Sequence, residues 1–410
     1  MGREAIKTKR LLRSLEKLLL GFRTELKLNN KQRTLLLKHA GVARHAYNWG
    51  LGLTKQILLH NRNNPTEKIK FPTAIDLHKW LVALVKPNNP WYYEVSKCAP
   101  QYALRALRDA WGRCFNKVAD APRFKKKGKK DKFTLDGSIK VEHFRVKVPV
   151  IGWLKTYERL PQGVRGKSVT ISRQANSWFI SFKIDVESIP TPKSVEVVGV
   201  DLGVLNLATL STGEVFEGAK SYRKLEKKLA RLQWLNRHKV IKSANWEKAQ
   251  IKIARLHKKI ADLRKDTLHK ITTYLAKNHR RIGIEDLNVS GMLANHKLAK
   301  VIADMGFYEF RRQLEYKCQL YRSELIIIDR WFPSSKTCSN CGVIKDSLSL
   351  SDRVFNCECG LSLERDLNAS LNLAKAVSST VSVCGLGKGR PSQDEAGISI
   401  KSTTVDVSKS

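Results

Sequence analysis

The sequence has no hydrophobic run approaching the roughly 20 apolar residues needed to span a bilayer, which argues against a membrane protein. Its most apolar N-terminal run, Leu18 to Leu20, is closely preceded by Arg13, Glu16 and Lys17. These charges leave no apolar segment or cleavage site typical of a secretion signal. We therefore expect no membrane partner and a protein of the reducing cytosol.

Acidic residues are also scarce. The 410 residues include 76 Lys and Arg but only 37 Asp and Glu, which gives a formal net charge of +39. The apolar fraction of 42% is large enough for a sizeable core, so a wholly disordered chain is excluded. At about 150 residues per domain, the length predicts two or three domains. The positive charge attracts polyanions, and nucleic acid is the first candidate.

Cysteine is infrequent, but four of the eight cysteines are bunched. Cys338 and Cys341 form a Cys-x-x-Cys pair, and after fifteen further residues Cys357 and Cys359 form a Cys-x-Cys pair. In a reducing compartment, bunched cysteines indicate a metal site and not disulfides. Four thiolates match a structural Zn²⁺ ribbon with every coordination position filled. The short second pair leaves open the alternative of a ribbon that has lost its metal.

The first half of the chain shows no internal repeat and changes pattern twice. Residues 22–28 alternate as a strand does, and residues 30–117 follow a helical pattern punctuated by prolines. A dense basic loop, residues 123–132, comes next. Alternation then returns in 139–141, 144–148, 168–171 and 178–182. Together these segments predict a small β-barrel with a helical insertion near its N-terminus.

The second half follows a linker around Pro190 and Pro192. Strands are predicted at 197–201, 205–210, 215–216, 281–285 and 325–329, with helices over 220–280, 304–322 and from about 366. This order predicts a mixed α/β, RNase H-like nuclease domain interrupted by the cysteine segment. From Ser378 the Ser, Thr and Gly content predicts a disordered tail.

Three carboxylates lie at the ends of predicted strands or at the start of a predicted helix. Asp201 and Glu285 each end an apolar strand, where burying a charge is costly, and Asp366 precedes the last helix. Carboxylates that converge at strand ends form an anionic oxygen cage suited to Mg²⁺. Two such ions about 4 Å apart stabilise both oxygens exchanged in phosphodiester cleavage. We therefore predict that these three residues are catalytic and bind two Mg²⁺ ions.

Three neighbours of these acids are weaker candidates. Asp286 follows Glu285 directly, and because side chains alternate along a strand we expect Glu285 to face the site and Asp286 to face away. Asp329 also ends a strand, and a packed structural residue is the favoured interpretation. Asn368 either assists the metal site or caps the helix, and the sequence favours neither.

Five motifs, in this order, resemble the TnpB family of insertion-sequence proteins, which look like ancestors of compact type V CRISPR effectors. They are Gly199–Gly203 (GVDLG), Ile284–Val289 (IEDLNV), Arg311–Lys317 (RRQLEYK), Phe332–Cys338 (FPSSKTC) and Arg365–Leu373 (RDLNASLNL). The resemblance covers roughly residues 21–376 and implies an RNA-guided DNA endonuclease. The resemblance implies that a guide RNA, the ωRNA, pairs with the target strand of double-stranded DNA. It further implies that a single RuvC-like site cuts both strands in turn beside a short transposon-adjacent motif.

The resemblance also implies a domain order and a bacterial or archaeal, nucleoid-associated location. The expected domains are an N-terminal extension with the first wedge strand (1–29), a helical recognition lobe (30–120), a wedge β-barrel (121–190), a RuvC-like nuclease (191–331), a zinc ribbon (332–362), the third RuvC-like motif (363–377) and the tail (378–410). The family's catalytic and zinc residues fall on the three acids and four cysteines named above.

Nucleic-acid contacts are expected in three places. The resemblance nominates Lys97, Gln101 and Thr134 for the DNA motif, because Lys and Gln can bond base edges and Thr can contact bases or phosphate. Between Lys220 and Lys265, sixteen Lys and Arg stand against three Asp and Glu, so these helices are predicted to hold phosphates. The residues singled out there and in the basic loop are Lys227, Lys228, Arg231, Arg123, Lys125, Lys126 and Lys127. Tyr47 and Trp49 could stack on bases, but core packing is favoured.

Three other functions fit parts of this pattern. A DNA transposase uses the same acids and metals, but the sequence shows no separate end-binding domain. A non-cleaving RNA-guided repressor fits a site that has lost an acid, whereas all three acids are present. A generic basic RNA-binding protein gives the strand-end acids no purpose. The sequence favours guided cleavage and leaves the oligomeric state open.

Overall fold

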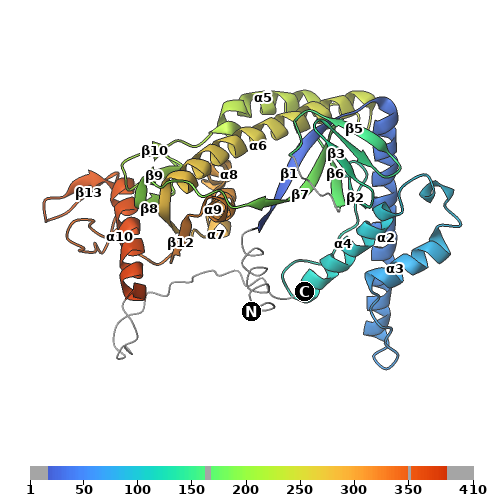
Figure 1. Cartoon of the computed structure of the whole chain (residues 1–410), viewed down its shortest axis with the longest axis horizontal. Helices are drawn as coiled ribbons and strands as arrows, with labels where there is room; N and C mark the ends of the chain where they lie inside the picture. Colours follow the sequence, from blue (N-terminus) through green and yellow to red (C-terminus); the bar gives the residue numbers. More distant parts are fainter. Residues whose placement is uncertain (1–16, 162–167, 350–351, 386–410) are drawn as a thin grey trace, which may run out of the picture. The chain divides into compact units, whose positions relative to one another are not determined.

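The structure is a computed structural model that describes residues 17–161, 168–349 and 352–385 (Figure 1). The chain divides into two compact units, and the boundary falls between Val186 and Glu187. We call Leu19–Val186 the N-terminal unit and the chain from Glu187 onward the C-terminal unit. Among the residues described, no helix has the length and apolarity needed to cross a membrane.

One seven-stranded sheet forms the β part of the N-terminal unit, in the order β2-β6-β7-β1-β5-β4-β3. Its strands are β1 (Lys17–Lys27), β2 (Lys132–Asp136), β3 (Lys140–Glu142), β4 (Arg145–Val148), β5 (Gly152–Thr156), β6 (Ser168–Gln174) and β7 (Ser177–Glu187). The pairs β1–β5, β2–β6, β3–β4, β4–β5 and β6–β7 are antiparallel. Closure of this sheet into the expected barrel stays a prediction.

Helices of the N-terminal unit pack on that sheet in one continuous core. They are α2 (Asn30–Asn63), α3 (Ala74–Trp80), the π-helical η1 (Leu81–Val85), the 3₁₀ turn η2 (Pro90–Tyr92) and α4 (Cys98–Phe115). The 34-residue α2 begins where Asn29 and Gln32 form a reciprocal capping box, which satisfies backbone N–H groups that the first turn leaves free. Leu36, Leu51 and Leu104 are fully buried between α2 and α4.

A mixed five-stranded sheet, in the order β10-β9-β8-β11-β12, organises the C-terminal unit. Its strands are β8 (Val195–Asp201), β9 (Ala208–Leu210), β10 (Val215–Phe216), β11 (His279–Glu285) and β12 (Glu324–Ile328). β8, β9 and β10 form an antiparallel meander, whereas β11 runs parallel to both β8 and β12. The meander and the strands that follow match the order expected from the sequence.

The helices of this unit are α5 (Ser221–Asn236), α6 (Ala244–Asn278), α7 (Val289–Ala294), α8 (Ala299–Met305), α9 (Phe307–Tyr321) and α10 (Arg365–Gly385). Two differ from the sequence prediction. The single helix expected over 304–322 is broken at Gly306, whose φ of +76° is left-handed, a conformation that glycine adopts without strain. The helix α10 continues through Ser378 to Gly385, into the region expected to be a disordered tail. The rest of that tail, 386–410, lies outside the described residues.

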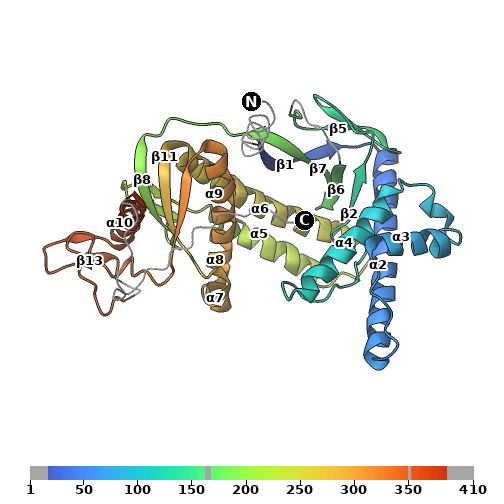
Figure 2. The ribbon, with the colours of Figure 1, turned by 60° about the horizontal axis from the view of Figure 1, so that its bottom comes forward.

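The two faces of the central strands carry different helices, and Figure 2 shows α10 on one side of β8 and β11 with α9 on the other. The helix α10 packs unusually close to the backbone of these strands. A side-chain carbon on Gly199 would lie 2.0 Å from the Ser370 carbonyl oxygen, and one on Gly283 would lie 2.5 Å from Val377 Cγ2. Both strands therefore need glycine at this level for α10 to reach the sheet.

The linker that opens the C-terminal unit is fastened to it by Lys193. Its Nζ donates to the carbonyl oxygens of Ala276 at 2.7 Å and Tyr321 at 2.9 Å and to the hydroxyl of Ser323 at 2.8 Å. The Ile189 N–H also donates to the Leu320 carbonyl at 2.7 Å. The predicted linker around Pro190 and Pro192 is thus bound to the C-terminal unit.

Candidate functional site

Two of the predicted acids end neighbouring parallel strands. In the β8–β11 ladder Gly199 pairs with Gly283 and Val200 with Ile284. Asp201 and Glu285 are the next residues of β8 and β11, so they share one level at the carboxyl edge of the sheet. Neighbouring strands lie about 4.8 Å apart, which brings these two half-buried carboxylates side by side.

The third acid reaches the same edge from α10. Side chains alternate along a strand, so Asp201 and Glu285 face the same way as Gly199 and Gly283, toward α10. Asp366 lies in the first turn of that helix, and its Oδ2 is 3.8 Å from the point where a Cβ on Gly203 would lie. The structure therefore brings Asp201, Glu285 and Asp366 together, as the sequence pattern predicts.

The electrostatics of these acids follow from their closeness. Burial, together with the nearby carboxylates of Asp366 and Glu285, raises the pKa of Asp201 to about 7. Burial and the neighbouring Asp286 also raise the pKa of Glu285. Like charges at short range disfavour the ionised forms. A divalent cation between them would offset this repulsion, and carboxylate oxygens are the ligands that Mg²⁺ prefers.

Asp286 faces the other side of the sheet, as strand alternation predicts. Its carboxylate forms ion pairs with Arg311 of α9 and Arg330, which hold the pKa of Asp286 below its usual range. Both arginines, Arg312 and Glu285 line one cavity of about 490 Å³. In the sequence, Arg311 and Arg312 belong to the RRQLEYK motif, which by itself assigns them no role. Their clustering beside Glu285 depends on α9 crossing the end of β11, which no local pattern reveals.

The four bunched cysteines form one cluster whose sulfur atoms all lie within 4.8 Å of one another. The Sγ atoms of Cys338 and Cys359 are 3.6 Å apart, as are those of Cys341 and Cys357. A tetrahedron with Zn–S bonds of about 2.3 Å has edges of about 3.8 Å. The backbone N–H of Leu361 and the amide of Asn340 lower the pKa of the Cys359 thiol to about 6. These features fit Zn²⁺, and the short second pair does not disturb the cluster.

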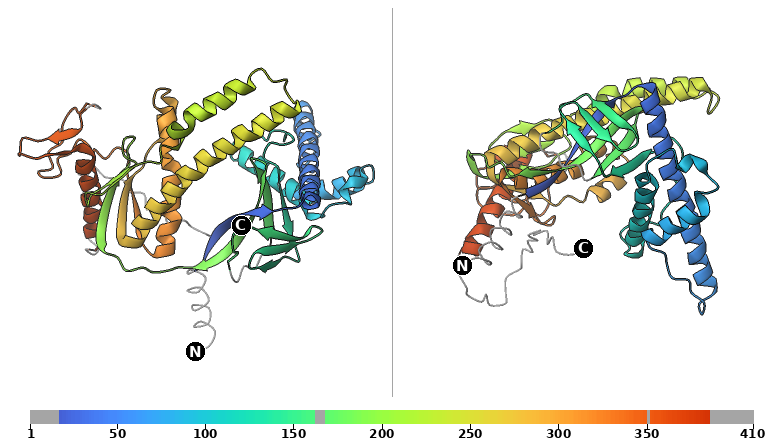
Figure 3. Two further views of the ribbon diagram at one scale, coloured as in Figure 1. Left: turned by 90° about the horizontal axis from the view of Figure 1, so that it is seen from above. Right: turned by 45° about the vertical axis from the view of Figure 1, so that its right-hand side comes forward.

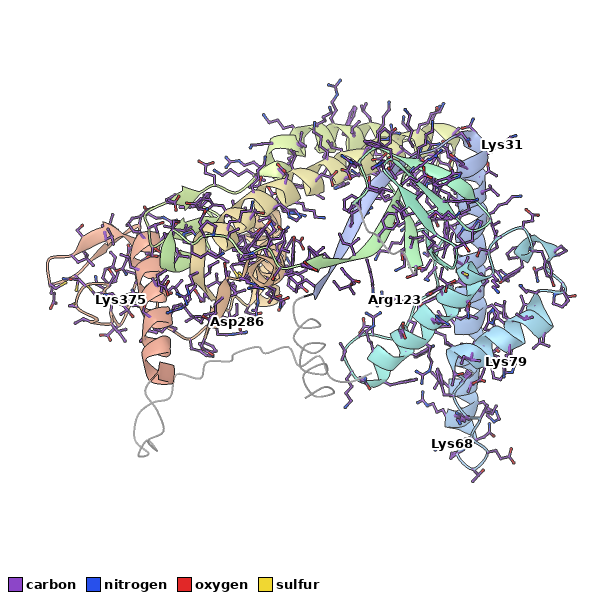
Figure 4. The ribbon with its side chains drawn as sticks, in the orientation of Figure 1. Lys31, Lys68, Lys79, Arg123, Asp286 and Lys375 are labelled. Carbon is purple, nitrogen blue, oxygen red and sulfur yellow. The ribbon has the colours of Figure 1, made fainter. Side chains whose placement is uncertain are left out.

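The cluster belongs to a small ribbon that is rooted on α10. Its two short strands are β13 (Val354–Asn356) and β14 (Ser362–Glu364). The fully buried Asn368 accepts a hydrogen bond from the Ser339 N–H at 2.9 Å and donates to the Thr337 carbonyl at 2.8 Å. Asn372 donates to the carbonyls of Ser334 and Thr337. Lys375, labelled in Figure 4, donates to the Ser339 carbonyl.

Asn368 therefore differs from both sequence interpretations. Both its amide oxygen and its amide nitrogen are hydrogen-bonded to the ribbon, so the side chain is directed at Ser339 and Thr337 and not at the acids or the end of the helix. Both of its partners lie about thirty residues earlier in the chain. Asp329 has a local role as well, since its Oδ1 accepts a hydrogen bond from the Trp331 N–H at 2.8 Å.

The residues nominated for the DNA motif lie on two elements that are tied together. Asp136, at the end of β2, accepts hydrogen bonds from the Cys98 thiol at 2.7 Å and the Tyr102 hydroxyl at 2.8 Å, both on α4. Exposed Lys97 and half-buried Gln101 therefore lie at the start of α4, close to the end of β2 that carries Thr134. The Thr134 hydroxyl is hydrogen-bonded to Thr170.

One lysine of the basic loop packs against the fold, and the other cations of the loop named above are exposed. Lys125 is half-buried with its ammonium 3.5 Å from the centre of the Tyr47 ring, and burial lowers its pKa to about 8. Arg123, labelled in Figure 4, is exposed, as are Lys126 and Lys127. These three lie on the surface, where they can meet phosphate, and Arg123 also pairs with Asp120 at 3.5 Å. Lys125 instead supports the loop. Tyr47 is buried, as favoured from the sequence, and Trp49 is only half-buried.

The helices α5 and α6 lie side by side, as Figure 3 shows. Leu229, Leu256 and Ile260 are buried between them. Lys227, Lys228 and Arg231 point outward and are exposed. The α5–α6 hairpin thus buries apolar side chains between its two helices and exposes basic side chains to solvent.

Three family models match segments of this chain. A family model described as "Probable transposase" matches residues 180–296, one described as "Cas12f1-like, TNB domain" matches 307–373, and one described as "Helix-turn-helix domain" matches 18–62. In the last segment the structure has the strand β1 followed by α2.

Two relatives cover most of the chain. "Putative RNA-guided DNA endonuclease InsQ" of Escherichia coli (strain K12) is 36% identical over 411 residues, 94% of this chain and 100% of the relative. A "Putative RNA-guided DNA endonuclease" of Streptomyces pristinaespiralis is 39% identical over 305 residues, 72% of this chain and 74% of the relative. The solved structure of the mini-RNA-guided endonuclease CRISPR-Cas_phi3 shares the fold, with a TM-score of 0.50 at 10% identity over 95% of this chain and 96% of that one.

The chain thus combines a cluster of three carboxylates at the edge of a mixed sheet with a ribbon that carries four cysteines. The chain belongs to the TnpB family, as its motifs predict.

Proposed function

We propose that this protein is an RNA-guided DNA endonuclease that cleaves target DNA beside a short transposon-adjacent motif. The observation that carries the proposal is the convergence of Asp201, Glu285 and Asp366 at one edge of the C-terminal sheet. The names of the relatives that cover most of the chain support guided cleavage. We further propose that this sheet and α10 form a RuvC-like, RNase H-like domain.

The three acids would hold two Mg²⁺ ions. Their fit to such ions rests on the convergence of three carboxylates at one edge of the sheet. Burial and the nearby carboxylates raise the pKa of Asp201, and a bound cation would offset both effects. When bound, the ions would stabilise both the attacking and the leaving oxygen of the phosphodiester. The chain itself supplies rigidity, because α10 packs directly on the backbone of β8 and β11 at Gly199 and Gly283. This close packing fixes the positions of the acids.

The cysteine cluster would hold a structural Zn²⁺ with all four positions filled by thiolates. Because Asn368 and Asn372 fasten the ribbon to α10, the metal would stabilise the helix that presents Asp366. We assign it no part in the chemistry.

The remaining surfaces would bind the guide RNA and the target DNA. Lys97, Gln101 and Thr134 are proposed to read the DNA motif. The exposed cations of the basic loop and of α5, namely Arg123, Lys126, Lys127, Lys227, Lys228 and Arg231, are proposed to contact phosphates, where each neutralised phosphate adds salt-dependent affinity.

The test is to sequence the RNA that co-purifies with the protein, reprogram it, and challenge a plasmid library with randomised flanks in Mg²⁺. We expect depletion of one flank motif. Asp201→Ala should reduce cleavage by at least about a thousandfold, as loss of a principal catalytic group does, and should leave RNA-dependent DNA binding unchanged.

The matched control is Asp329→Asn, which changes another strand-end carboxylate and keeps the oxygen that Trp331 uses. It should cleave at the wild-type rate. Equal loss of binding and cleavage in Asp201→Ala would contradict the catalytic assignment. Bound RNA without cleavage would favour the repressor, and strand joining would favour the transposase.

A further inference from the structure

A second cavity lies in the N-terminal unit, where none of the family's catalytic or zinc residues occur. It has a volume of about 760 Å³, and its lining comes from one face of α2, from Trp91 in η2 and from Glu94 just after η2. The side chains that matter here are Lys38, Arg44, His45, Trp49, Trp91 and Glu94. Two indoles, an imidazole and two cations in one pocket fit a nucleotide, which offers a flat base and a charged phosphate.

The aromatic part of this pocket is already ordered. Trp91 stacks on Tyr92 with ring centres 4.5 Å apart, and the edge of His45 meets Trp91 at 5.0 Å. The His45 Nδ1 is hydrogen-bonded to the Tyr92 hydroxyl at 2.8 Å, which fixes the imidazole. Trp91 nevertheless stays 37% exposed. A base that stacks there would meet a fixed indole, so little conformational entropy is lost on binding.

The polar part of the pocket connects it to the basic loop. Asn48, also in the lining, makes two hydrogen bonds to the Lys125 backbone, at 2.8 and 3.0 Å. Arg44 pairs with Asp131, which accepts from the Gly128 N–H, so the other end of the loop is held on the same helix face. The exposed lysines of this loop therefore lie beside the pocket, where the phosphates flanking a bound base would come.

We propose that this pocket binds one unstacked nucleobase of the guide RNA, an inference that rests on the proposed function. A base enters such a pocket only when it has left the helical stack, as bases do in RNA loops and bulges, whereas bases of duplex DNA stay stacked and paired. The indole of Trp91 stacks on the base. Glu94, which pairs with Lys38, accepts a hydrogen bond from an exocyclic amino group.

Gly41 allows the pocket to be filled without disturbing the fold. It lines the cavity on α2, and a Cβ added there would meet only Arg44 Nη2, at 4.0 Å. In Gly41→Leu the leucine would therefore occupy the space proposed for the base. The matched control is Gly52→Leu on the same helix, where an added Cβ meets nothing within 4 Å and which lies outside the lining. Both substitutions favour the helix.

The experiment measures the affinity of the co-purified guide RNA for each full-length variant in the Asp201→Ala background, with thermal unfolding as the check on folding. Gly41→Leu should weaken RNA binding about tenfold, the size of one lost base–aromatic stack, and Gly52→Leu should not. Trp91→Ala should match Gly41→Leu, and Trp91→Phe should restore most of the affinity. Tyr93→Ala, a neighbouring exposed ring outside the lining, should bind as the wild type does.

Photocrosslinking of the assembled complex then identifies the occupant, with 4-thiouridine in the RNA or 5-iodouracil in the DNA. An RNA crosslink to Trp91 supports the proposal, and a crosslink to target DNA alone overturns it. Wild-type RNA affinity in both Gly41→Leu and Trp91→Ala also overturns it while leaving guided cleavage intact. Failure of the wild-type protein to bind any discrete RNA would overturn the proposed function as well.

Discussion

At the scale of single residues, the most unusual group outside the acid site is Lys317. It is 4% exposed, and its Nζ donates to the His269 carbonyl and to the hydroxyls of Thr272 and Thr273 at 2.7 to 2.8 Å. Burial lowers its pKa to about 8. This ammonium joins α9 to α6 through neutral oxygens, without an ion pair to a carboxylate in the described part of the chain.

The buried Lys317 should make stability depend on pH in an alkaline window. Because its pKa is about 8 in the folded state and about 10.4 when unfolded, the unfolded chain binds the proton more tightly between these values. The free energy of unfolding contributed by this group therefore rises with pH from about 8 to about 10. Lys317→Met should flatten that rise, measured by urea unfolding at several pH values. An unchanged slope would mean that the pKa of Lys317 in the folded protein is close to its value in the unfolded chain.

The place of a side chain was predictable from the sequence where it depends only on neighbouring residues of the same strand. Asp201 and Glu285 follow apolar strands, and alternation alone separates Glu285 from Asp286. Asn368 was not predictable, because its partners Thr337 and Ser339 reach it only after the ribbon has folded back onto α10.

At the scale of secondary-structure elements, the contact between α10 and the sheet decides where the third acid lies. Gly199 and Gly283 form one level of that contact, and the residues two positions further along each strand are catalytic candidates. A helix that moved away from this level would carry Asp366 with it. The site therefore depends on two residues that have no side chain.

Gly199→Ala should separate α10 from β8, because the added carbon would lie 2.0 Å from the Ser370 carbonyl oxygen and 2.5 Å from the Ala374 nitrogen. Both atoms are backbone, so relief requires the helix to shift. We expect a loss of about 1–3 kcal/mol in the free energy of unfolding and a drop in cleavage rate with RNA binding retained. Chemical unfolding and cleavage assays measure both effects.

Gly112→Ala is the control, since an added carbon there meets nothing within 4 Å inside α4. It should be neutral or slightly stabilising. Similar behaviour of the two variants would show that α10 tolerates displacement from the sheet.

Element types were largely predictable from periodicity, and the misses have physical causes. The strands β2 and β5 were not predicted. β2 begins directly after the run of lysines in the basic loop, and β5 begins at Gly152, whose φ is +83°. The break between α8 and α9 was missed because the apolar spacing continues across Gly306. There the close approach of Arg264 and Leu268, 3.2 Å from an added Cβ, also leaves no room for a side chain.

At the scale of the whole molecule, the chain consists of two units with separate cores. The length predicted several domains and the charge predicted a polyanion partner. The periodicity predicted the order of strands in the C-terminal sheet, and its assignment to a nuclease domain stays a prediction. The division between wedge and recognition lobe stays a prediction, because the strands and helices of the N-terminal unit share one continuous core.

Removal of zinc should therefore affect the units unequally. The ribbon lies in the C-terminal unit and is rooted on α10, so a strong chelator should lower the melting temperature of that unit and leave the N-terminal transition in place. Differential scanning calorimetry with and without the chelator measures this. Cys341→Ser should reproduce the effect, and melting that is unaltered in both experiments would count against a structural metal.

The fastening of Lys193 to the C-terminal unit has a practical consequence. Every core residue of one unit precedes Val186, every core residue of the other follows Glu187, and the hydrogen bonds of Lys193 and Ile189 keep the second segment's start in place. The chain just after β7, which ends at Glu187, is thus a natural point at which to split the gene into two separately produced fragments. Tags that associate on addition of a drug or light, attached at the new ends, would then allow an experimenter to time when a genome is cut.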